Sequence, residues 1–377
     1  QKNSIANEPF LETSRFYKSV LGFDSARIGT VASALLSKLS ENPSETGVIP
    51  TPYTHQIDAL ESFIKNNRNI VVATGTGSGK TETFLYPLVS HLVGLAKEAP
   101  TTSPSTKALI LYPMNALVAD QTTRLRKILG SDGSRSIIRS EIGLPLRFGS
   151  YTGATPYAGV PTEQRNRENI EPLRDLYKVD AQTSEEIKYR DALQASNRVP
   201  AKTDIRTFLD NAELTTDFES IINPNDSELI FRGEMQVCPP DIMVTNYSML
   251  EYMLLRPIEQ TIFDRTQDWL ASDQQNQFTI VLDEAHMYTG TTGSEVSLLL
   301  RRLINRIGAR PTQIRFMVTS ASLGDNDEKI REIANKLTGL DGDSFEIIHD
   351  QTEKPLKSGK CSDVIADLLS QISPAEI

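Results

Sequence analysis

The strongest constraint on this chain is an apolar run at residues 70–73 that leads straight into the glycine-rich turn TGTGSGKT at residues 74–81. Glycines allow a backbone to curl so that its N–H groups converge on a polyphosphate. Lys80 can reach the outer phosphates, and the Thr81 hydroxyl can hold Mg²⁺. Residues 82–96 favour a helix whose positive N-terminus would face the same phosphates. The stretch therefore predicts a phosphate-binding loop, although Thr74 stands where the strict pattern has a glycine.

The composition is that of an ordinary globular protein. The 377 residues are 38% hydrophobic and 23% charged, enough for one large domain with insertions or for two or three average ones. No apolar run approaches membrane-spanning length and no signal peptide is visible, so we expect no membrane segment. Cys238 and Cys361 lack metal-ligand spacing, which indicates free thiols and a cytoplasmic location. The net charge of −10 argues against a surface that is basic throughout, but it does not exclude a local basic groove.

Apolar runs alternate with helical stretches along most of the chain. Those with the length of strands are 70–73, 108–112, 144–151, 242–245, 279–282 and 314–319. Several lack the alternation of a half-exposed strand, as expected for parallel strands that are buried on both faces. The pattern predicts an α/β fold with a doubly wound parallel sheet, in which ligands bind at the carboxyl ends of the strands.

We divide the chain into three parts. Residues 1–48 are expected to form an N-terminal helical segment, residues 49–350 the α/β domain, and residues 351–377 an exit segment. A polar insertion at about residues 155–238 interrupts the domain, with 10 Lys and Arg against 16 Asp and Glu. We expect it to be mostly helical or partly flexible. Its acidity makes it a poor candidate for binding a phosphate backbone.

A second strong signal is the sequence IVLDEAH at residues 280–286, where an apolar strand ends in two carboxylates. Asp283 is well placed to hold the Mg²⁺ shell beside the phosphate loop. Glu284 can polarise the attacking water as a general base. An Asp-Glu pair after a strand is common by itself, but together with an upstream phosphate loop it completes a nucleoside-triphosphatase site.

These motifs resemble those of the DEAD/DEAH-box helicases of superfamily two. Residues 283–286 resemble motif II, residues 74–81 motif I, residues 53–56 the adenine-recognition element, and residues 319–322 motif III. The resemblance covers about residues 50–350. It implies the first of two RecA-like motor domains, with ATP and Mg²⁺ as cofactors.

The resemblance also implies roles for single residues. It assigns catalysis to Lys80, Asp283 and Glu284, and metal binding to Thr81 and Asp283. The residues expected to bind ATP are Tyr53, Gln56, Thr76, Gly77, Ser78, Gly79, Lys80, Thr81 and Glu82. His286, Ser320 and Ser322 would couple hydrolysis to movement of the nucleic acid.

Three further elements lie where the family binds nucleic acid. Residues 112–121 occupy the place of motif Ia, residues 151–153 resemble motif Ib, and residues 245–250 resemble the Thr-Pro-x-x-Leu element. Such loops hold phosphate oxygens through backbone N–H groups and hydroxyls without reading the base sequence. The contacts expected on this basis are Asn115, Gln121, Thr152, Gly153, Thr245 and Asn246. Nucleic acid, DNA more than RNA, is the expected partner.

Residues 115–117, 245–252 and 286–290 resemble large bacterial helicases, including those of anti-phage defence systems such as Druantia and DISARM. Defence proteins would then be further partners. No arginine-finger motif of the type Gln-x-x-Gly-Arg-x-x-Arg follows residue 322, so we expect a second motor domain outside this sequence. The resemblance predicts an ATP-dependent helicase motor. The alternatives are a double-strand translocase that does not unwind, a nucleic-acid-binding scaffold switched by ATP, and an unrelated P-loop ATPase.

Overall fold

The computed structural model describes residues 16–75, 77–99, 103–156, 162–321 and 326–352. Residues 19–350 form one compact unit. Residues 16–18 and 351–352 belong to a separate part of the chain, in which Tyr17 and Thr352 form an antiparallel bridge. Thr76, Ser322 and Cys361 lie outside the described residues. Among the residues that are described, we find no helix with the length and apolarity that crossing a bilayer requires.

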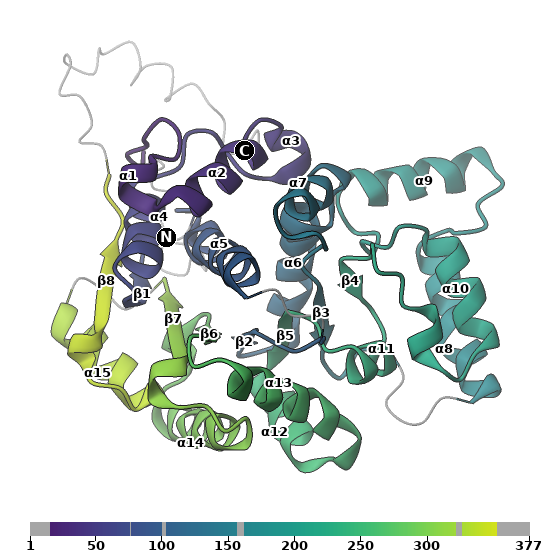
Figure 1. Cartoon of the computed structure of the whole chain (residues 1–377). Coiled ribbons are helices and arrows are strands. Elements are labelled where there is room, and N and C mark those ends of the chain that lie inside the picture. The colour runs from purple at the N-terminus through teal and green to yellow at the C-terminus, as the bar shows by residue number, and fades with distance from the viewer. Residues whose placement is uncertain (1–15, 76, 100–102, 157–161, 322–325, 353–377) are drawn as a thin grey trace, which may run out of the picture. The chain divides into compact units, whose positions relative to one another are not determined.

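Within the described residues, one sheet of eight parallel strands organises the unit 19–350 (Figure 1). In spatial order the strands are β4 (Glu228–Leu229), β3 (Phe148–Tyr151), β5 (Ile242–Asn246), β2 (Ala108–Tyr112), β6 (Phe278–Leu282), β7 (Ile314–Ser320), β1 (Asn69–Ala73) and β8 (Phe345–His349). The predicted parallel α/β sheet is confirmed, and each predicted run overlaps a strand. In the run 144–151 the strand begins only at Phe148, after Pro145, which has no N–H to donate to a neighbouring strand.

Alternate residues of each strand enter two hydrophobic cores on opposite faces of the sheet. On β1, Ile70 and Val72 pack into the first core and Val71 into the second. Helices of the first core are α1 (Ser25–Ile28), α2 (Thr30–Leu39), α4 (Thr54–Leu60), α5 (Lys80–Glu98), α6 (Asn115–Leu125) and α7 (Asp132–Ile142). Helices of the second core are α11 (Arg232–Val237), α12 (Tyr247–Leu255), α13 (Gln260–Ser272), α14 (Gly290–Arg306) and α15 (Asp327–Thr338). The N-terminal helices α1 and α2 thus share a core with the sheet.

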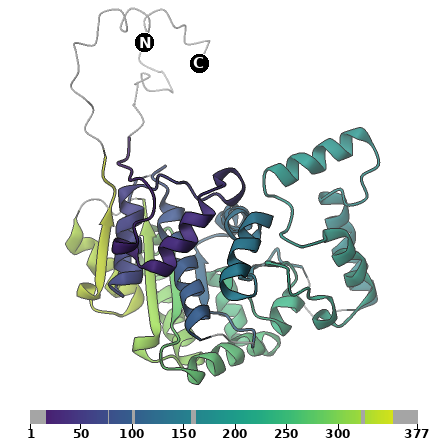
Figure 2. The same cartoon turned by 45° about the horizontal axis from the view of Figure 1, so that its top comes forward.

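The polar insertion folds between β3 and β5 around a small core of its own. It comprises the helices α8 (Glu163–Leu176), α9 (Ser184–Ala195) and α10 (Ile205–Leu214), followed by β4 and α11. Phe208, Phe218 and Phe231 lie at the centre of its hydrophobic cluster. Figures 1 and 2 both show α8, α9 and α10, in teal, to one side of the sheet beyond the β4 edge. The described residues of the insertion are thus mostly helical.

Buried ion pairs stabilise the insertion and connect it to the residue that follows α6. The Lys202 side chain has 0% exposure, forms an ion pair with Glu234 and lies 3.4 Å from Asp226 Oδ2. Burial raises the pKa of Glu234, and the neighbouring ammonium opposes that rise. Arg126, which follows α6, donates two hydrogen bonds of 2.8 Å to the Glu228 carboxylate on β4. These charges would be costly to bury without their partners.

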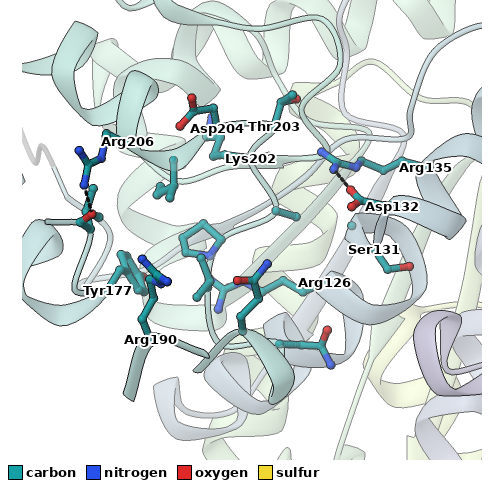
Figure 3. A pocket seen from close by; sticks show the side chains of 18 of the residues that line it. Arg126, Ser131, Asp132, Arg135, Tyr177, Arg190, Lys202, Thr203, Asp204 and Arg206 are labelled. Atoms are coloured by element: carbon teal, nitrogen blue, oxygen red, sulfur yellow. Dashed lines mark hydrogen bonds and ion pairs between the residues drawn. The ribbon is translucent and has the colours of Figure 1, made fainter. Parts of the chain in front are cut away.

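A cavity of about 610 Å³ lies at the seam between the insertion and the sheet domain (Figure 3). Charged side chains of both signs line it: Glu45, Arg126, Asp132, Arg135, Arg190, Lys202, Asp204 and Arg206. Most of the cations already have carboxylate partners, such as Arg135 at Asp132 and Arg206 at Asp180. Because the charges largely cancel, we assign no anionic ligand to this cavity.

Candidate active site

Three loops meet at the carboxyl ends of the neighbouring strands β1, β7 and β6. β1 pairs with β7, with Ala73 opposite Ser320, and β7 pairs with β6, with Val318 opposite Leu282. The phosphate loop follows β1, and Asp283 directly follows β6. Since the carboxyl ends of parallel strands open on one edge of a sheet, segments that are distant in the sequence contribute to a single site here.

The phosphate loop takes its shape from two glycines and a hydroxyl contact. Gly77 has a φ of +75° and Gly79 a φ of +70°, a region that glycine enters without a steric penalty. The Ser78 hydroxyl lies 2.8 Å from Thr74 Oγ1. Thr74 therefore has a structural role inside the loop, which explains why a hydroxyl-bearing residue is accommodated where the strict pattern has glycine.

Residues at the start of α4 support the phosphate loop from one side. His55 is fully buried, and its Nε2 donates to the Ser78 carbonyl at 2.8 Å. Burial lowers the pKa of His55, which keeps the ring neutral at pH 7. Gln56 accepts from the Tyr53 N–H at 2.9 Å and donates to the Gly79 carbonyl at 3.2 Å. The sequence placed Tyr53 and Gln56 at this site but missed His55, whose only signal was its position between them.

We expect Gly79→Ala to weaken ATP binding about tenfold. An added Cβ would lie 2.6 Å from Gln56 Nε2, and alanine would have to adopt left-handed backbone, which costs about 1–2 kcal/mol. A titration with a fluorescent ATP analogue measures the effect. The control is Gly94→Ala in α5, where nothing lies within 4 Å of an added Cβ. Equal affinity in the two variants would contradict the prediction.

Asp283 and Glu284 lie opposite the phosphate-loop lysine. Lys80 Nζ is 3.5 Å from Glu284 Oε1. Asp283 is buried and accepts hydrogen bonds from the Thr319 hydroxyl and, at 2.9 Å, from the Glu284 N–H. Burial raises the pKa of Asp283 above its usual value, while the hydrogen bond from Thr319 opposes the rise. Thr319 was not among the predicted site residues, and its place at the start of the motif III-like segment was the signal for it.

A strained backbone and a histidine connect this loop to β7. Glu284 has a φ of +52°, a conformation that is costly for a residue with a side chain and is concentrated at functional sites. Glu284 Oε2 lies 3.3 Å from His286 Nδ1, and the same nitrogen lies 3.1 Å from Ser320 Oγ. The two predicted coupling residues that are described, His286 and Ser320, are therefore in contact.

The donors at this edge fit a magnesium ion that arrives with a nucleotide. Thr81 offers a hydroxyl, and Asp283 offers a buried carboxylate. In the part of the chain that the structure describes, no group of three or more His, Cys, Asp or Glu side chains could hold a metal by itself. Mg²⁺ commonly takes one or two protein ligands and completes its shell with phosphates and waters, which suits so sparse a donor set.

Gln121 lies at the nucleotide side of α6. Its side chain is buried, and its Nε2 lies 3.3 Å from Thr81 Oγ1. Close by on the same helix, Arg124 forms an ion pair of 2.8 Å with Glu82 of α5. This geometry favours a positioning role for Gln121 on the proposed metal-binding hydroxyl over the nucleic-acid contact that the sequence predicted.

We expect Gln121→Ala to weaken Mg·ATP binding about fivefold, because the hydrogen bond to Thr81 contributes about 1 kcal/mol. Binding of an oligonucleotide without nucleotide should not change. Asn115→Ala, at the other end of α6, should show the reverse pattern. Separate titrations with nucleotide and with labelled oligonucleotide measure both effects. Loss of oligonucleotide binding alone in Gln121→Ala would restore the sequence-based assignment.

The loops after β2, β5 and β3 continue the same edge of the sheet. Tyr112 lies opposite Asn246 in the β2–β5 pair, and Tyr151 lies opposite Thr245 in the β3–β5 pair. Asn246 donates to Asn115 Oδ1 and caps α12. The structure thus brings predicted contacts from two separate motifs together.

The remaining predicted nucleic-acid residues differ in exposure. Thr245 is fully buried and donates to the Tyr151 carbonyl at 2.6 Å. Thr152 is buried, and its hydroxyl accepts from the Ala154 N–H at 3.2 Å. Gly153 is exposed, nothing lies within 4 Å of an added Cβ, and its carbonyl lies 3.5 Å from Arg232 Nη2. Thr245 and Thr152 shape these loops, while Gly153 offers backbone to a ligand, and the contacts themselves stay predictions.

Comparison with known proteins identifies the class. The model of the DEAD/DEAH box helicase family matches residues 53–149. The structure of the DEAD-box helicase Mss116 bound to ssRNA and UDP-BeF aligns with a TM-score of 0.50 and 15% identity, covering 88% of this chain and 46% of that one. Residues 53–149 thus match a DEAD/DEAH box helicase domain, and the sheet has the RecA-like fold of such domains.

The chain is also similar to particular helicase relatives. It is 40% identical over 360 residues to the Druantia protein DruE of Escherichia coli (strain UMEA 4076-1), covering 90% of this chain and 19% of that protein. It is 21% identical over 284 residues to the uncharacterized ATP-dependent helicase MJ1574 of Methanocaldococcus jannaschii, covering 75% of this chain and 28% of that protein. The chain thus spans less than a third of either relative, and the predicted resemblance to Druantia is confirmed.

Proposed function

We propose that this chain is the ATP-binding lobe of a motor that moves along or unwinds nucleic acid. The observation that carries the proposal is the shared edge of the sheet. Loops with phosphate-binding and carboxylate residues follow β1, β6 and β7, and loops suited to a nucleic-acid backbone follow the neighbouring strands β2, β5 and β3. α6 spans the two halves, from Asn115 to the Gln121–Thr81 contact.

Bound Mg·ATP would supply the phosphoryl-transfer chemistry. Lys80 and the loop N–H groups hold the phosphates, and Thr81 and Asp283 hold the metal. Glu284 accepts the proton of the attacking water. These roles rest on the 3.5 Å separation of Lys80 and Glu284 and on the buried Asp283–Thr319 hydrogen bond.

Three further residues complete the proposed site. Gln56 would read the adenine edge with the N–H and the oxygen lone pair that remain beside its contacts to Gly79 and Tyr53, since an amide can both donate and accept. A movement of Glu284 would reach the end of β7 through His286. Its Nδ1 lies 3.3 Å from Glu284 Oε2 and 3.1 Å from Ser320 Oγ.

The proposal includes a second RecA-like lobe in the same polypeptide. The sequence has no arginine-finger motif after residue 322, and such an arginine contributes about 10³–10⁵ to the rate in related enzymes. Residues 1–377 alone should therefore bind ATP and hydrolyse it very slowly. Turnover by this segment at the rate of a complete helicase would contradict the proposal.

The test uses the complete polypeptide, with ATP turnover measured alone, with single-stranded DNA and with RNA. We expect stimulation by nucleic acid, and more by DNA than by RNA. Strand displacement on a forked duplex then separates an unwinding helicase from a double-strand translocase. Turnover that neither nucleic acid changes would exclude a motor and favour an ATP-switched scaffold.

A role in anti-phage defence is proposed on the 40% identity to the Druantia protein DruE. The efficiency of phage plating should be low on cells that carry the complete system with the natural protein. It should be high on cells with Lys80→Ala, because that variant lacks the phosphate-binding ammonium. Equal plating with both proteins would show that defence does not depend on ATP at this site.

A further inference from the structure

A groove of about 450 Å³ opens beside the loops that follow β2 and β3. One wall is α6, with Asn115, Val118, Ala119 and Thr122. The floor is the end of β3 and the loop after it, with Ser150, Thr152, Ala154 and Thr155. The opposite wall belongs to the insertion, with Leu173, Leu176 and Tyr177 at the end of α8. The insertion therefore closes a groove that the sheet domain leaves open.

Residues predicted to contact nucleic acid line this groove from two separate motifs. Asn115 begins α6, and Thr152 lies in the loop after β3. Gly153, which is exposed and has nothing within 4 Å of an added Cβ, lies between the groove residues Thr152 and Ala154. A backbone that followed this loop would bring its bases against the α8 wall.

The α8 wall suits a base and not a phosphate. Leu176 is 50% exposed at the end of a helix that is otherwise strongly polar. Among the described residues that line the groove, the one cation is Arg126, which Glu228 already holds through two hydrogen bonds. Tyr177 and Arg126 also line the neighbouring cavity of Figure 3. Tyr177 therefore lies at the boundary between the groove and that cavity.

The volume of the groove favours a single unstacked nucleotide over a duplex. Its volume lies within the range of about 300–1,000 Å³ that holds one small molecule. An unstacked nucleotide fits such a space, whereas a duplex keeps its bases stacked and paired. Apolar and aromatic side chains bind the faces of unpaired bases with little regard for sequence.

We propose that the insertion forms the outer wall of a single-strand path, in which Leu176, supported by Leu173 and Tyr177, contacts an unpaired base while the backbone follows the loop at Gly153. The inference rests on the proposed motor function and gives the acidic insertion a part in it. The contact is to an uncharged base, and the phosphates follow the loop at Gly153, outside the segment 155–238 that carries the net charge of −6.

The test compares Leu176→Asp with Leu214→Asp in the complete protein. Leu214 is 84% exposed at the end of α10, in the same insertion but outside the groove. Fluorescence anisotropy with a labelled thymidine oligomer should show about tenfold weaker binding for Leu176→Asp, the effect of losing one base contact. Leu214→Asp should bind as the natural protein does. The unfolding midpoint and the affinity for an ATP analogue should stay unchanged in both variants.

The possible outcomes separate this inference from the motor proposal. If Leu176→Asp binds the oligomer normally while Asn115→Ala binds it weakly, the wall is not used and the motor proposal stands. If Leu176→Asp weakens binding of a blunt duplex as much as that of the single strand, the contact to an unpaired base is wrong. If the natural protein binds neither DNA nor RNA, the motor proposal fails and the inference fails with it.

Discussion

In the complete motor, Glu284→Gln should lower ATP turnover by roughly 10²–10⁴-fold, the usual contribution of a general base, and leave ATP binding nearly intact. The amide keeps the size of the side chain but cannot take the proton of the attacking water. Lys80 Nζ, now 3.5 Å from Glu284 Oε1, remains free to bind phosphate. Steady-state turnover with saturating nucleic acid and a separate nucleotide titration measure the two effects.

Glu295→Gln is the matched control. The substitution makes the same chemical change, and Glu295 is exposed on α14. It should leave turnover unchanged. A Glu284→Gln protein that retained most of its turnover would remove this residue from the general-base role. Survival of the cellular function in an inactive Glu284→Gln protein would favour the ATP-switched scaffold.

Lys202→Met should lower the free energy of unfolding by about 3–5 kcal/mol, the loss typical when one partner of a buried ion pair is removed. Lys202 and Glu234 side chains are both 0% exposed, so the remaining carboxylate has no access to water. Urea denaturation followed by circular dichroism measures the change. The insertion should be affected first, because Lys202, Asp226 and Glu234 all lie within it.

Lys188→Met, at an exposed position of α9, is the control and should change stability little. Adding Glu234→Gln to Lys202→Met should recover part of the loss, since the unpaired buried carboxylate becomes a neutral amide. If the Lys202 and Lys188 variants unfold at the same urea concentration, the buried cluster does not stabilise the insertion.

The role of α6 connects these predictions with the groove. Its first residue, Asn115, accepts a hydrogen bond from Asn246 at the nucleic-acid loops, and Gln121 and Arg124 contact the phosphate-loop helix. A shift of Thr81 or Glu82 would therefore be transmitted along α6 to the groove beside this helix. The opposite responses expected of Gln121→Ala and Asn115→Ala test the two ends of this connection.

The fold class and the nucleotide half of the candidate site could be predicted from the sequence alone. Parallel strands that are buried on both faces appear as continuous apolar runs, and the strand, glycine turn and helix of a phosphate loop are contiguous in the chain. The loop at residues 74–81 and the carboxylates Asp283 and Glu284 could therefore be predicted as parts of one site, because both follow strands and ligands bind at strand ends.

The contacts between distant segments of the chain became visible only in the folded structure. The spatial order of the strands places Thr319 on Asp283 and Gln121 on Thr81, and the fold of α4 puts His55 against Ser78. The same holds for the groove between α6 and α8. Local patterns report burial and turn chemistry, but such contacts depend on strand order and on how an insertion packs back on its sheet, which are properties of the whole chain.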